Sequence, residues 1–597
     1  MSLPEDQKLQ EARAHKSADR IEEARTALSQ GDMNKAETQA KQVINSAPNE
    51  PEAYAILAQV LRSSGRFSEA AENFKIAIEL SPSSPDIYMN YGVLMASLDR
   101  LEEGWKSLPV LTISLKSGIQ MIVPDLLSTL TTYVLLEQER WFEDEIDFVA
   151  KVLQPGDQAI DIGANYGSYS LTASKCVGDQ GRVWAFEPAS FTAGFLRRSL
   201  QHVNATNVIV TNSAMSNQVG MASFQVSTNS ELSSLGDAKQ VVSTEQVPTT
   251  TLDHCAVQLE WSEIEFLKID TEGHEQQVLS GGRKFFSDET PLVMYEVAEP
   301  GKARKKLVDK FASYGYGSYR LLPGLGILVP IDSSSLAQVD ILNLFSCKAD
   351  RAARLFSRDL LIDEIGLLPK LIESAWRQFL EGLENSDSQE DLIEELGQAD
   401  TEDRIIYREA IGWYAMSRSG QLPMPQRYAC LLYCASLLEP ISDPDNPVKI
   451  PYFTLFTRVT LDLGWQSKAV EALTPVVVRI LSGGLMPLFD PAIPILSRFD
   501  NINPAGQTHD WLVANVIEAY HHNVYFSSLR AEMPQLKIYD FLKSNSFSDR
   551  EMTRSRLLLR NRLGFLPDTQ ADDPVYKAAP DNLNAGFWVK QFGIDQS

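Results

Sequence analysis

The sequence has few cysteines and no long apolar run. Five cysteines occur in 597 residues, and no two of them form a Cys-x-x-Cys pair. This scarcity excludes a disulfide framework and a paired-cysteine metal site, and it predicts a reducing compartment. No segment reaches the roughly 18 uncharged apolar residues of a membrane span, and the first residues show no apolar signal segment. We therefore expect a soluble, cytoplasmic protein.

Positive charge is also scarce. The 54 basic residues are outnumbered by 79 acidic ones, which gives a net charge of −25. Such a surface repels the phosphates of nucleic acids and anionic lipids, so we expect neither as a partner. The hydrophobic content of 44% is ordinary for a protein with buried cores. The length predicts about three to four domains.

The first part of the sequence repeats every 34 residues. Pro51 and Pro85 are 34 apart (85 − 51), and the small residues Ala24, Ala58 and Gly92 keep the same spacing. This period, with small residues where helices cross, resembles the tetratricopeptide repeat. The positions expected to reverse the chain between two helices recur in the same way: Gly31, Gly65 and Asp99. The repeats predict a docking groove for a peptide or protein, with an architectural cap or a dimer contact as the alternative.

Short apolar segments alternate with helical patterns in the middle of the chain, which is typical of a parallel α/β sheet. In such a sheet the ligand binds at the carboxyl ends of the strands, near the point where the strand order reverses. Polar side chains follow each predicted strand. The predicted strands are Gln158–Ile162, Arg182–Phe186, Val208–Asn212, Ile264–Ile269 and Leu292–Val297, with a hairpin of about Gly317–Leu322 and Gly326–Ile331.

The first of these strands leads into a nucleotide-binding turn. Asp161 ends the strand, and Gly163, Asn165 and Gly167 follow before a predicted helix over Tyr169–Val177. Glycine lets the backbone approach a ligand closely. A dinucleotide fingerprint needs a third glycine, which is missing here, and the acidic residue that opens the loop would repel a diphosphate. The turn therefore favours S-adenosylmethionine, which carries an ammonium and a sulfonium, over NAD.

Further donor-binding residues are expected at the ends of the next strands. Glu187 lies 26 residues after Asp161 (187 − 161), where a carboxylate can accept hydrogen bonds from both ribose hydroxyls. Ser213 is a candidate for the adenine edge. Asp161 and Asn165 are expected to hold the polar end of the donor or the shape of the loop. The alternative for each acidic residue taken alone is a helix cap or a solvated loop charge.

Together with later segments, these residues resemble the FkbM methyltransferases. The resemblance covers about residues 120–350. It implies a Rossmann-like, S-adenosylmethionine-dependent methyltransferase that acts on a hydroxyl of a sugar or a secondary metabolite. The segments that carry it are Asp161–Ser170, Phe186–Pro188, Glu231–Leu235, Thr251–Asp253, Lys268–Glu275 and Leu342–Phe345.

The loop after the fourth strand is the expected source of a catalytic base. A hydroxyl acceptor loses its proton as the new bond forms, so a nearby base accelerates the transfer. Asp270 is the first candidate, and Glu272 and His274 follow it in the sequence. For His274 the alternative is a surface or supporting group. Gly273 is expected to permit a tight turn into one helix over Gln276–Phe286.

A metal is not required by the spacing of these residues. Asp270, Glu272 and Glu296 offer hard oxygen ligands, but we predict no metal. Lys268, which lies within the fourth strand, is expected to neutralise neighbouring carboxylates.

Two other segments have alternative interpretations. The stretch Ser227–Thr250 is rich in Ser, Thr and Val, and it predicts an acceptor-binding lid or a plain surface hairpin. Trp141 and Phe142 could cover a ligand, although packing between helix and sheet is the more common role of such side chains.

Residues 351–597 are predicted to be α-helical, without a catalytic motif. Cys430 and Cys434 lie one helical turn apart in an apolar helix, which favours core packing over metal binding. His521 and His522 are expected to be structural, with sugar binding as the alternative. The sequence does not decide whether this region binds the acceptor, a partner or a second subunit.

The sequence thus predicts three parts. Residues 1–118 form tetratricopeptide-like repeats, residues 119–350 a methyltransferase domain, and residues 351–597 an α-helical region. We expect O-methylation of a saccharide, glycan or secondary-metabolite acceptor, with S-adenosylmethionine as the donor and the repeats as a possible docking site. The alternatives are an interaction scaffold with an inactive donor-binding sheet and an NAD-dependent oxidoreductase. The oligomeric state is left open.

Overall fold

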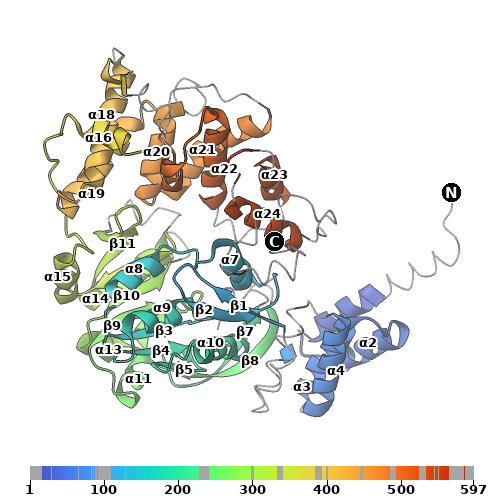
Figure 1. Ribbon diagram of the computed structural model, residues 1–597. Helices are drawn as coiled ribbons and strands as arrows, with labels where there is room; N and C mark the ends of the chain where they lie inside the picture. The colour runs from blue at the N-terminus through green and yellow to red at the C-terminus, as the bar shows by residue number, and fades with distance from the viewer. Residues whose placement is uncertain are drawn as a thin grey trace, which may run out of the picture.

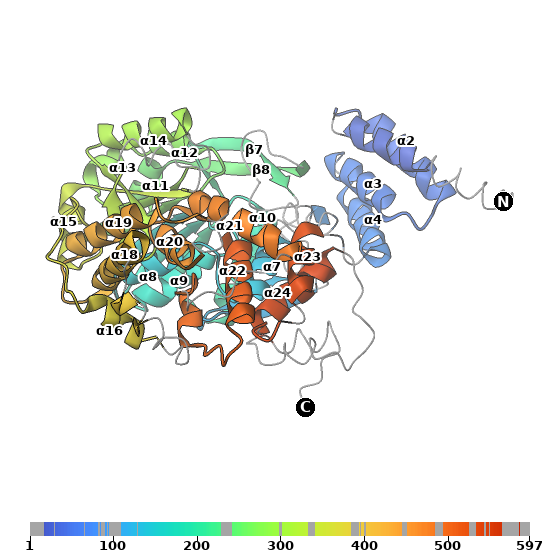
Figure 2. The same cartoon turned by 90° about the horizontal axis from the view of Figure 1, so that it is seen from above.

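The computed structural model consists of three regions (Figure 1). A small group of helices precedes a central α/β sheet, and a second helical region lies over that sheet, as the view from above also shows (Figure 2). The structure describes the chain except for residues 1–16, 29, 65, 82–83, 85–86, 88–89, 92–93, 95–108, 128, 228–240, 298–300, 332–340, 384–392, 395, 399–400, 444–449, 484–492, 524–532, 543–544, 549, 564–583 and 585–597.

The N-terminal helices pack as the repeat pattern predicts. Helices α2 (Met33–Ser46), α3 (Pro51–Ser63) and α4 (Phe67–Leu80) contact one another in sequence order. Pro51 begins α3, where the missing amide proton of proline costs nothing. The small residues of the repeat are fully buried between the helices: Ala24, Ala36, Ala58 and Ala70. The predicted turn positions Gly65 and Asp99 lie outside the described residues, whereas Gly31 has the left-handed φ of 77° that suits a turn.

A hairpin and a buried helix connect the repeats to the sheet. Strands β1 (Val110–Ser114) and β2 (Gln120–Pro124) pair antiparallel, and α7 (Leu130–Gln138) follows. The Ile122 amide donates a hydrogen bond of 2.8 Å to Ser199 Oγ, which attaches the hairpin to the central domain.

The central sheet has eight strands in the order β12-β11-β13-β10-β9-β3-β4-β5. The five strands from β10 to β5 are parallel, and β13 pairs antiparallel with both β10 and β11. The strand order reverses at β3, which has β9 on one side and β4 on the other. The strands are β3 (Gln158–Ile162), β4 (Arg182–Phe186), β5 (Val208–Thr211), β9 (Ile264–Ile269), β10 (Leu292–Glu296), β11 (Gly317–Leu322), β12 (Ile327–Pro330) and β13 (Asn343–Cys347).

Alternate strand side chains fill two separate cores, because successive residues of a strand point to opposite faces. Ala159 belongs to one core and Ile160 to the other. Helices α8 (Glu145–Val152), α9 (Ser168–Val177) and α10 (Ser190–His202) contribute to the first core. The second core is covered by α11 (Leu252–Gln258), α12 (Glu275–Ser280), α13 (Arg283–Asp288) and α14 (Lys302–Ser313). The α/β prediction is confirmed.

The prediction of one helix over Gln276–Phe286 is wrong. Helix α12 ends at Ser280 and α13 begins at Arg283, with Gly281 and Gly282 between them. A Cβ atom on Gly281 would lie only 2.2 Å from the carbonyl oxygen of Ser216. The break therefore lets the backbone pack closely against the segment that follows β5.

A small second sheet borders the carboxyl ends of the main strands. Its order is β6-β8-β7, from Ala214–Met215, Val241–Thr250 and Gly220–Ser227 respectively. β7 and β8 pair antiparallel as in a hairpin. Of the segment predicted as a lid or hairpin, residues 228–240 lie outside the described residues, and so does Glu231–Leu235 of the family resemblance.

The C-terminal region is helical, as predicted, and has two apolar cores. Cys430 and Cys434 are fully buried in one of them, which confirms their packing role. No helix within the described residues is both long and apolar enough to cross a membrane. The helices are α15 (Ala349–Ser357), α16 (Ala375–Glu381), α18 (Glu402–Arg418), α19 (Met424–Leu438), α20 (Ile450–Asp462), α21 (Gln466–Leu481), η4 (Ser497–Asn501), α22 (Thr508–Asn523), α23 (Met533–Leu542) and α24 (Arg550–Arg562).

Specific polar contacts attach the C-terminal helices to the central domain. Arg320 Nη1 donates to the Leu463 carbonyl at 2.8 Å, and Arg554 Nε donates to the Glu137 carbonyl at 2.9 Å. His521 is buried, with its Nε2 atom 3.8 Å from Glu137 Oε1. The structural interpretation of His521 is therefore confirmed, and this side chain belongs to the contact between the two regions.

Candidate active site

The turn after β3 touches the end of β9 through a glycine. Gly163 has φ = 77°, and a Cβ atom built on it would lie 1.7 Å from the Asp270 carbonyl oxygen. The Asp270 amide in turn donates to the Ile162 carbonyl at 3.0 Å. No other residue type fits this position, because both the space and the left-handed conformation are closed to a side chain.

Glu187 ties this turn to β4 with both of its carboxylate oxygens. Oε2 accepts the Asn165 amide and Oε1 accepts the Ala189 amide, each at 2.8 Å. The side chain is buried, and it lines the pocket at the end of the strand. A carboxylate oxygen can accept more than one hydrogen bond, so this geometry is compatible with a ligand hydroxyl as a further donor.

A pocket lies at the point where the strand order reverses. Two buried polar atoms of its lining residues, Asn165 Oδ1 and Ser213 Oγ, have no hydrogen-bond partner within the described part of the chain. Buried polar atoms are normally paired, so this pocket suits a polar ligand. Seven of the nine predicted site residues line it: Gly163, Asn165, Glu187, Ser213, Asp270, Glu272 and His274.

The other two predicted residues, Asp161 and Gly167, lie beneath the loop. Asp161 is 3% exposed and accepts a 2.6 Å hydrogen bond from Ser170 Oγ. Burial raises the pKa of Asp161, and the nearby Lys268 ammonium opposes this effect. Gly167 packs against Leu196. Of the two roles considered for Asp161, the structure favours holding the shape of the loop.

Lys268 forms the ion pair that the sequence predicts. Its Nζ atom donates to Asp270 Oδ2 at 2.8 Å and lies 3.8 Å from Asp161 Oδ1. Burial disfavours the ammonium, but the two carboxylates outweigh it and raise the pKa of Lys268 above its ordinary value. Lys268 is therefore charged, and it partly neutralises this acidic end of the sheet.

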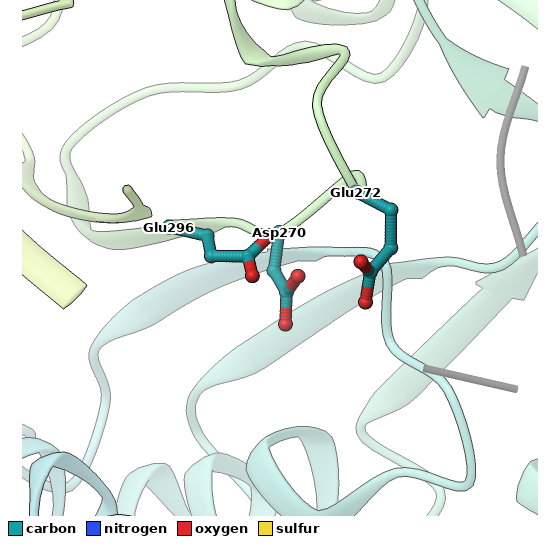
Figure 3. Close-up of side chains that lie close together, drawn as sticks. All are labelled: Asp270, Glu272 and Glu296. Atoms are coloured by element: carbon teal, nitrogen blue, oxygen red, sulfur yellow. The ribbon is translucent and has the colours of Figure 1, made fainter. Parts of the chain in front are cut away.

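Three carboxyl groups converge at the ends of β9 and β10 (Figure 3). One oxygen each of Asp270, Glu272 and Glu296 lies within 4.8 Å of the others. Burial raises the pKa of Glu296 well above its usual range, and the charges of Asp270 and Glu272 raise it further. Both effects favour the protonated form of Glu296.

Removing divalent cations tests whether these carboxyl groups act without a metal. Oxygen clusters of this kind bind Mg²⁺ or Ca²⁺, but Lys268 already pairs with Asp270, and burial favours the protonated form of Glu296. Dialysis against EDTA is therefore expected to change the methyl-transfer rate by less than about twofold. Removal of a catalytic metal would instead cause a large loss of rate. A large loss that added Mg²⁺ restores would show that this expectation is wrong.

The loop after β9 is held by Glu275 rather than by His274. Glu275 Oε1 accepts the amides of Thr271 and Gly273 at 3.1 and 3.0 Å, together with the Thr271 hydroxyl at 2.9 Å. His274 Nε2 lies 3.0 Å from Ser216 Oγ. Burial lowers the pKa of His274, so its imidazole is neutral at physiological pH.

Glu143, in the loop before α8, is a site residue that the sequence did not reveal. Its carboxylate accepts hydrogen bonds from Tyr169 Oη at 2.8 Å, Asn343 Nδ2 at 2.9 Å and Trp141 Nε1 at 3.0 Å. Burial raises the pKa of Glu143, and the charge of Asp270 adds to this shift. Tyr169 and Asn343 are 26 and 200 residues away in the sequence, so no local pattern could connect them to Glu143.

The neighbouring Glu145 predicts a stability that falls as pH rises. Burial is the main cause that raises the pKa of Glu145, to about 8, and repulsion from the charge of Glu143 is the second cause. The native chain thus keeps a proton that the unfolded chain releases above its ordinary pKa of about 4.3. Between these values the unfolded state binds fewer protons, so raising the pH lowers the free energy of unfolding.

Thermal unfolding of Glu145→Gln measures this contribution. The variant cannot titrate, so its melting temperature should fall less between pH 5 and pH 9 than that of the unmodified chain. The difference should be at least about 2–4 °C, the shift that 1 kcal/mol produces in a domain of 150–250 residues, because a pKa rise from about 4.3 to about 8 corresponds to more than about 1 kcal/mol. Parallel curves for the two proteins would mean that Glu145 titrates normally.

Comparisons with known proteins agree with this arrangement. Residues 161–317 match the model of the methyltransferase FkbM domain, and residues 21–85 and 57–104 match the tetratricopeptide repeat. No curated protein matches the chain.

Solved structures similar to the chain include two methyltransferases. One is an S-adenosylmethionine-dependent methyltransferase from Aquifex aeolicus, with 12% identity over 36% of this chain and 90% of the other, at a TM-score of 0.20. The second is an S-adenosylmethionine-dependent O-methyltransferase from Thermotoga maritima, with 13% identity over 42% and 81%, at a TM-score of 0.22. On the two family matches, the chain contains a methyltransferase FkbM domain preceded by tetratricopeptide repeats.

Proposed function

We propose that the chain transfers a methyl group from S-adenosylmethionine to a hydroxyl oxygen of a saccharide, glycan or secondary metabolite. The observation that carries this proposal is the pocket between the ends of β3, β4 and β9. It joins a buried carboxylate, Glu187, to two unpartnered polar atoms on Asn165 and Ser213, with the acidic loop at Asp270 on its far side. This set suits an adenine nucleoside with a positively charged end.

Each residue of the donor site has a proposed role. Glu187 accepts hydrogen bonds from the ribose hydroxyls, and Ser213 contacts the adenine edge. Asn165 offers its unpartnered amide oxygen to the polar end of the donor. Gly163 allows the backbone to approach the ligand, and Asp161 with Gly167 holds the loop beneath it.

Methyl transfer is an in-line displacement in which a carbon–oxygen bond forms as the carbon–sulfur bond breaks. When bound, S-adenosylmethionine supplies an electrophilic methyl carbon. The chain must then align the acceptor hydroxyl and remove its proton. We assign the role of base to Asp270. Lys268 donates a hydrogen bond to one of its carboxylate oxygens, Oδ2, and the other oxygen, Oδ1, is the proposed acceptor of the proton from the hydroxyl. Glu272 and the neutral His274 border the same space and are the next candidates for the base.

The three-part division is part of the proposal. We assign the repeats to docking of a protein partner. We place the end of the catalytic domain at residue 350, and we move its start from residue 119 to the beginning of the β1–β2 hairpin. Because β1 pairs with β2, the whole hairpin from Val110 to Pro124 belongs with the sheet. We also propose a reducing compartment, the cytoplasm, because none of the five cysteines is bonded to another.

A labelled-methyl experiment tests the reaction. The chain is incubated with tritiated S-adenosylmethionine and with the protein, small-molecule and glycan fractions of an extract from its source cells. We expect label in a fraction other than protein, and we expect the label to survive mild alkali, as a methyl ether does. Alkali-labile label would indicate methyl esters and contradict O-methylation of a hydroxyl. Labelling of no fraction would contradict methyl transfer itself and favour the scaffold alternative.

A further inference from the structure

A second cavity lies between the central domain and the C-terminal helices. It has a volume of about 490 Å³, and it is bordered by the loop between α7 and α8, by β11 and β13, and by the start of α21 and the end of α22. The polar residues that define it here are Arg140, Glu143, Asn343, Gln466, His522 and Asn523.

The floor of this cavity adjoins the acidic end of the sheet. Glu143 and Asn343 line it and are hydrogen-bonded to each other. Asn343 of β13 is paired in register with Glu296 of β10, which belongs to the converging carboxyl groups. The charge of Asp270 also acts on Glu143 and raises its pKa. The cavity and the donor pocket therefore lie on either side of one group of neighbouring carboxyl side chains: Glu143 lines the cavity, and Asp270 lines the pocket.

The lining of the cavity suits a neutral molecule with many hydroxyl groups. Amide, guanidinium, imidazole and carboxyl groups line it, so it offers both hydrogen-bond donors and acceptors. Cationic and acidic side chains both contribute, which gives no strong preference for a charged ligand. Phe142 adds an aromatic surface. Its volume of about 490 Å³ falls within the roughly 300–1,000 Å³ of ordinary small-molecule pockets, so the cavity accommodates a sugar or a molecule of similar size.

The outer wall of the cavity is held in place. Gln466 Nε2 donates to the Asn523 carbonyl at 3.2 Å, which joins α21 to the end of α22. The contact of Arg320 with Leu463, which lies just before α21, and the contact of Arg554 of α24 with Glu137 attach the C-terminal helical region to the central domain. A preorganised wall of this kind lowers the entropic cost of binding.

From these observations we infer that the C-terminal helical region forms one wall of the acceptor site. The acceptor is a polyhydroxylated molecule, such as a sugar or the end of a glycan, and it reaches Asp270 past Glu143. This inference rests on the proposed function, since it locates and describes the acceptor of the same reaction.

Variants that narrow the cavity test the inference. His522→Trp and Gln466→Trp add bulk on the outer wall, and Val478→Trp is the matched control on the exposed side of α21. The probe is tritiated S-adenosylmethionine with the protein-free glycan fraction of the source cells. Both cavity variants should lose about tenfold or more of the labelling, equal to about 1.4 kcal/mol, with unchanged affinity for S-adenosylmethionine. The control should label as the unmodified chain does.

The outcomes separate this inference from the proposed function. Full labelling by both cavity variants, or label found only in protease-sensitive material, would overturn the inference. If the unmodified chain bound S-adenosylmethionine but labelled nothing, the proposed function itself would fail. Thermal unfolding checks the fold of each variant. If the tryptophan variants do not fold, Gln466→Ala should raise the apparent KM for the glycan fraction and leave kcat unchanged, and an unchanged KM would equally overturn the inference.

Discussion

Replacing Asp270 with asparagine is expected to lower the methyl-transfer rate by about 10²- to 10⁴-fold, the usual contribution of a general base. Asparagine has nearly the same shape and can still accept a hydrogen bond from Lys268, but it cannot take a proton from the acceptor. Donor binding should therefore be preserved. Single-turnover rates with labelled S-adenosylmethionine measure the first effect, and calorimetry measures the second.

The control for this substitution is Asp288→Asn, which alters an exposed aspartate at the end of α13 and should leave the rate unchanged. If Asp270→Asn transferred methyl groups as fast as the unmodified chain, the base would have to be another residue. The pH dependence would then identify it. Since burial lowers the pKa of His274 below its ordinary 6.5, a histidine base would lose activity only as the pH falls through a value below 6.5.

Replacing Glu187 with alanine is expected to weaken donor binding by about 2–5 kcal/mol, or roughly 30- to 3,000-fold, the cost of truncating a buried, hydrogen-bonded charge. Two effects add together here. The ligand loses the carboxylate that holds its ribose, and the amides of Asn165 and Ala189 lose the acceptor that holds the turn. Calorimetric titration with S-adenosylmethionine measures the total loss.

A second ligand separates these two effects. Adenosine carries the ribose but lacks the amino-acid end, so Glu187→Ala should weaken adenosine binding as well. Asp179→Ala, which removes an exposed carboxylate after α9, is the control and should bind both ligands normally. Unchanged affinity for adenosine in Glu187→Ala would remove Glu187 from the ribose site.

The parts of the fold that sequence alone could predict are those determined locally. β3, β4, β9 and β11 have the predicted bounds, because each is a short apolar segment between turn residues. The role of Gly163 was also readable, since a glycine directly after a strand marks a close approach of the backbone. The sequence does not predict the break between α12 and α13, because the close approach of Gly281 to Ser216 exists only in the folded chain.

Contacts between distant segments could not be predicted. β13 is the last strand of the sheet in sequence, yet it lies between β10 and β11, and nothing in its residues gives this register. Glu143 acquires its environment from Tyr169 and Asn343. The sequence leaves sugar binding as an alternative role for His522. Only the packing of the C-terminal helices places this side chain on the cavity wall.

The most direct test of this account is a calorimetric titration of the intact chain with S-adenosylmethionine and, separately, with NAD. The loop with its two glycines and its buried carboxylates should bind one S-adenosylmethionine per chain and should give no binding heat with NAD. Binding of NAD, or a complete lack of heat with S-adenosylmethionine, would contradict the assignment of this pocket to a methyl donor.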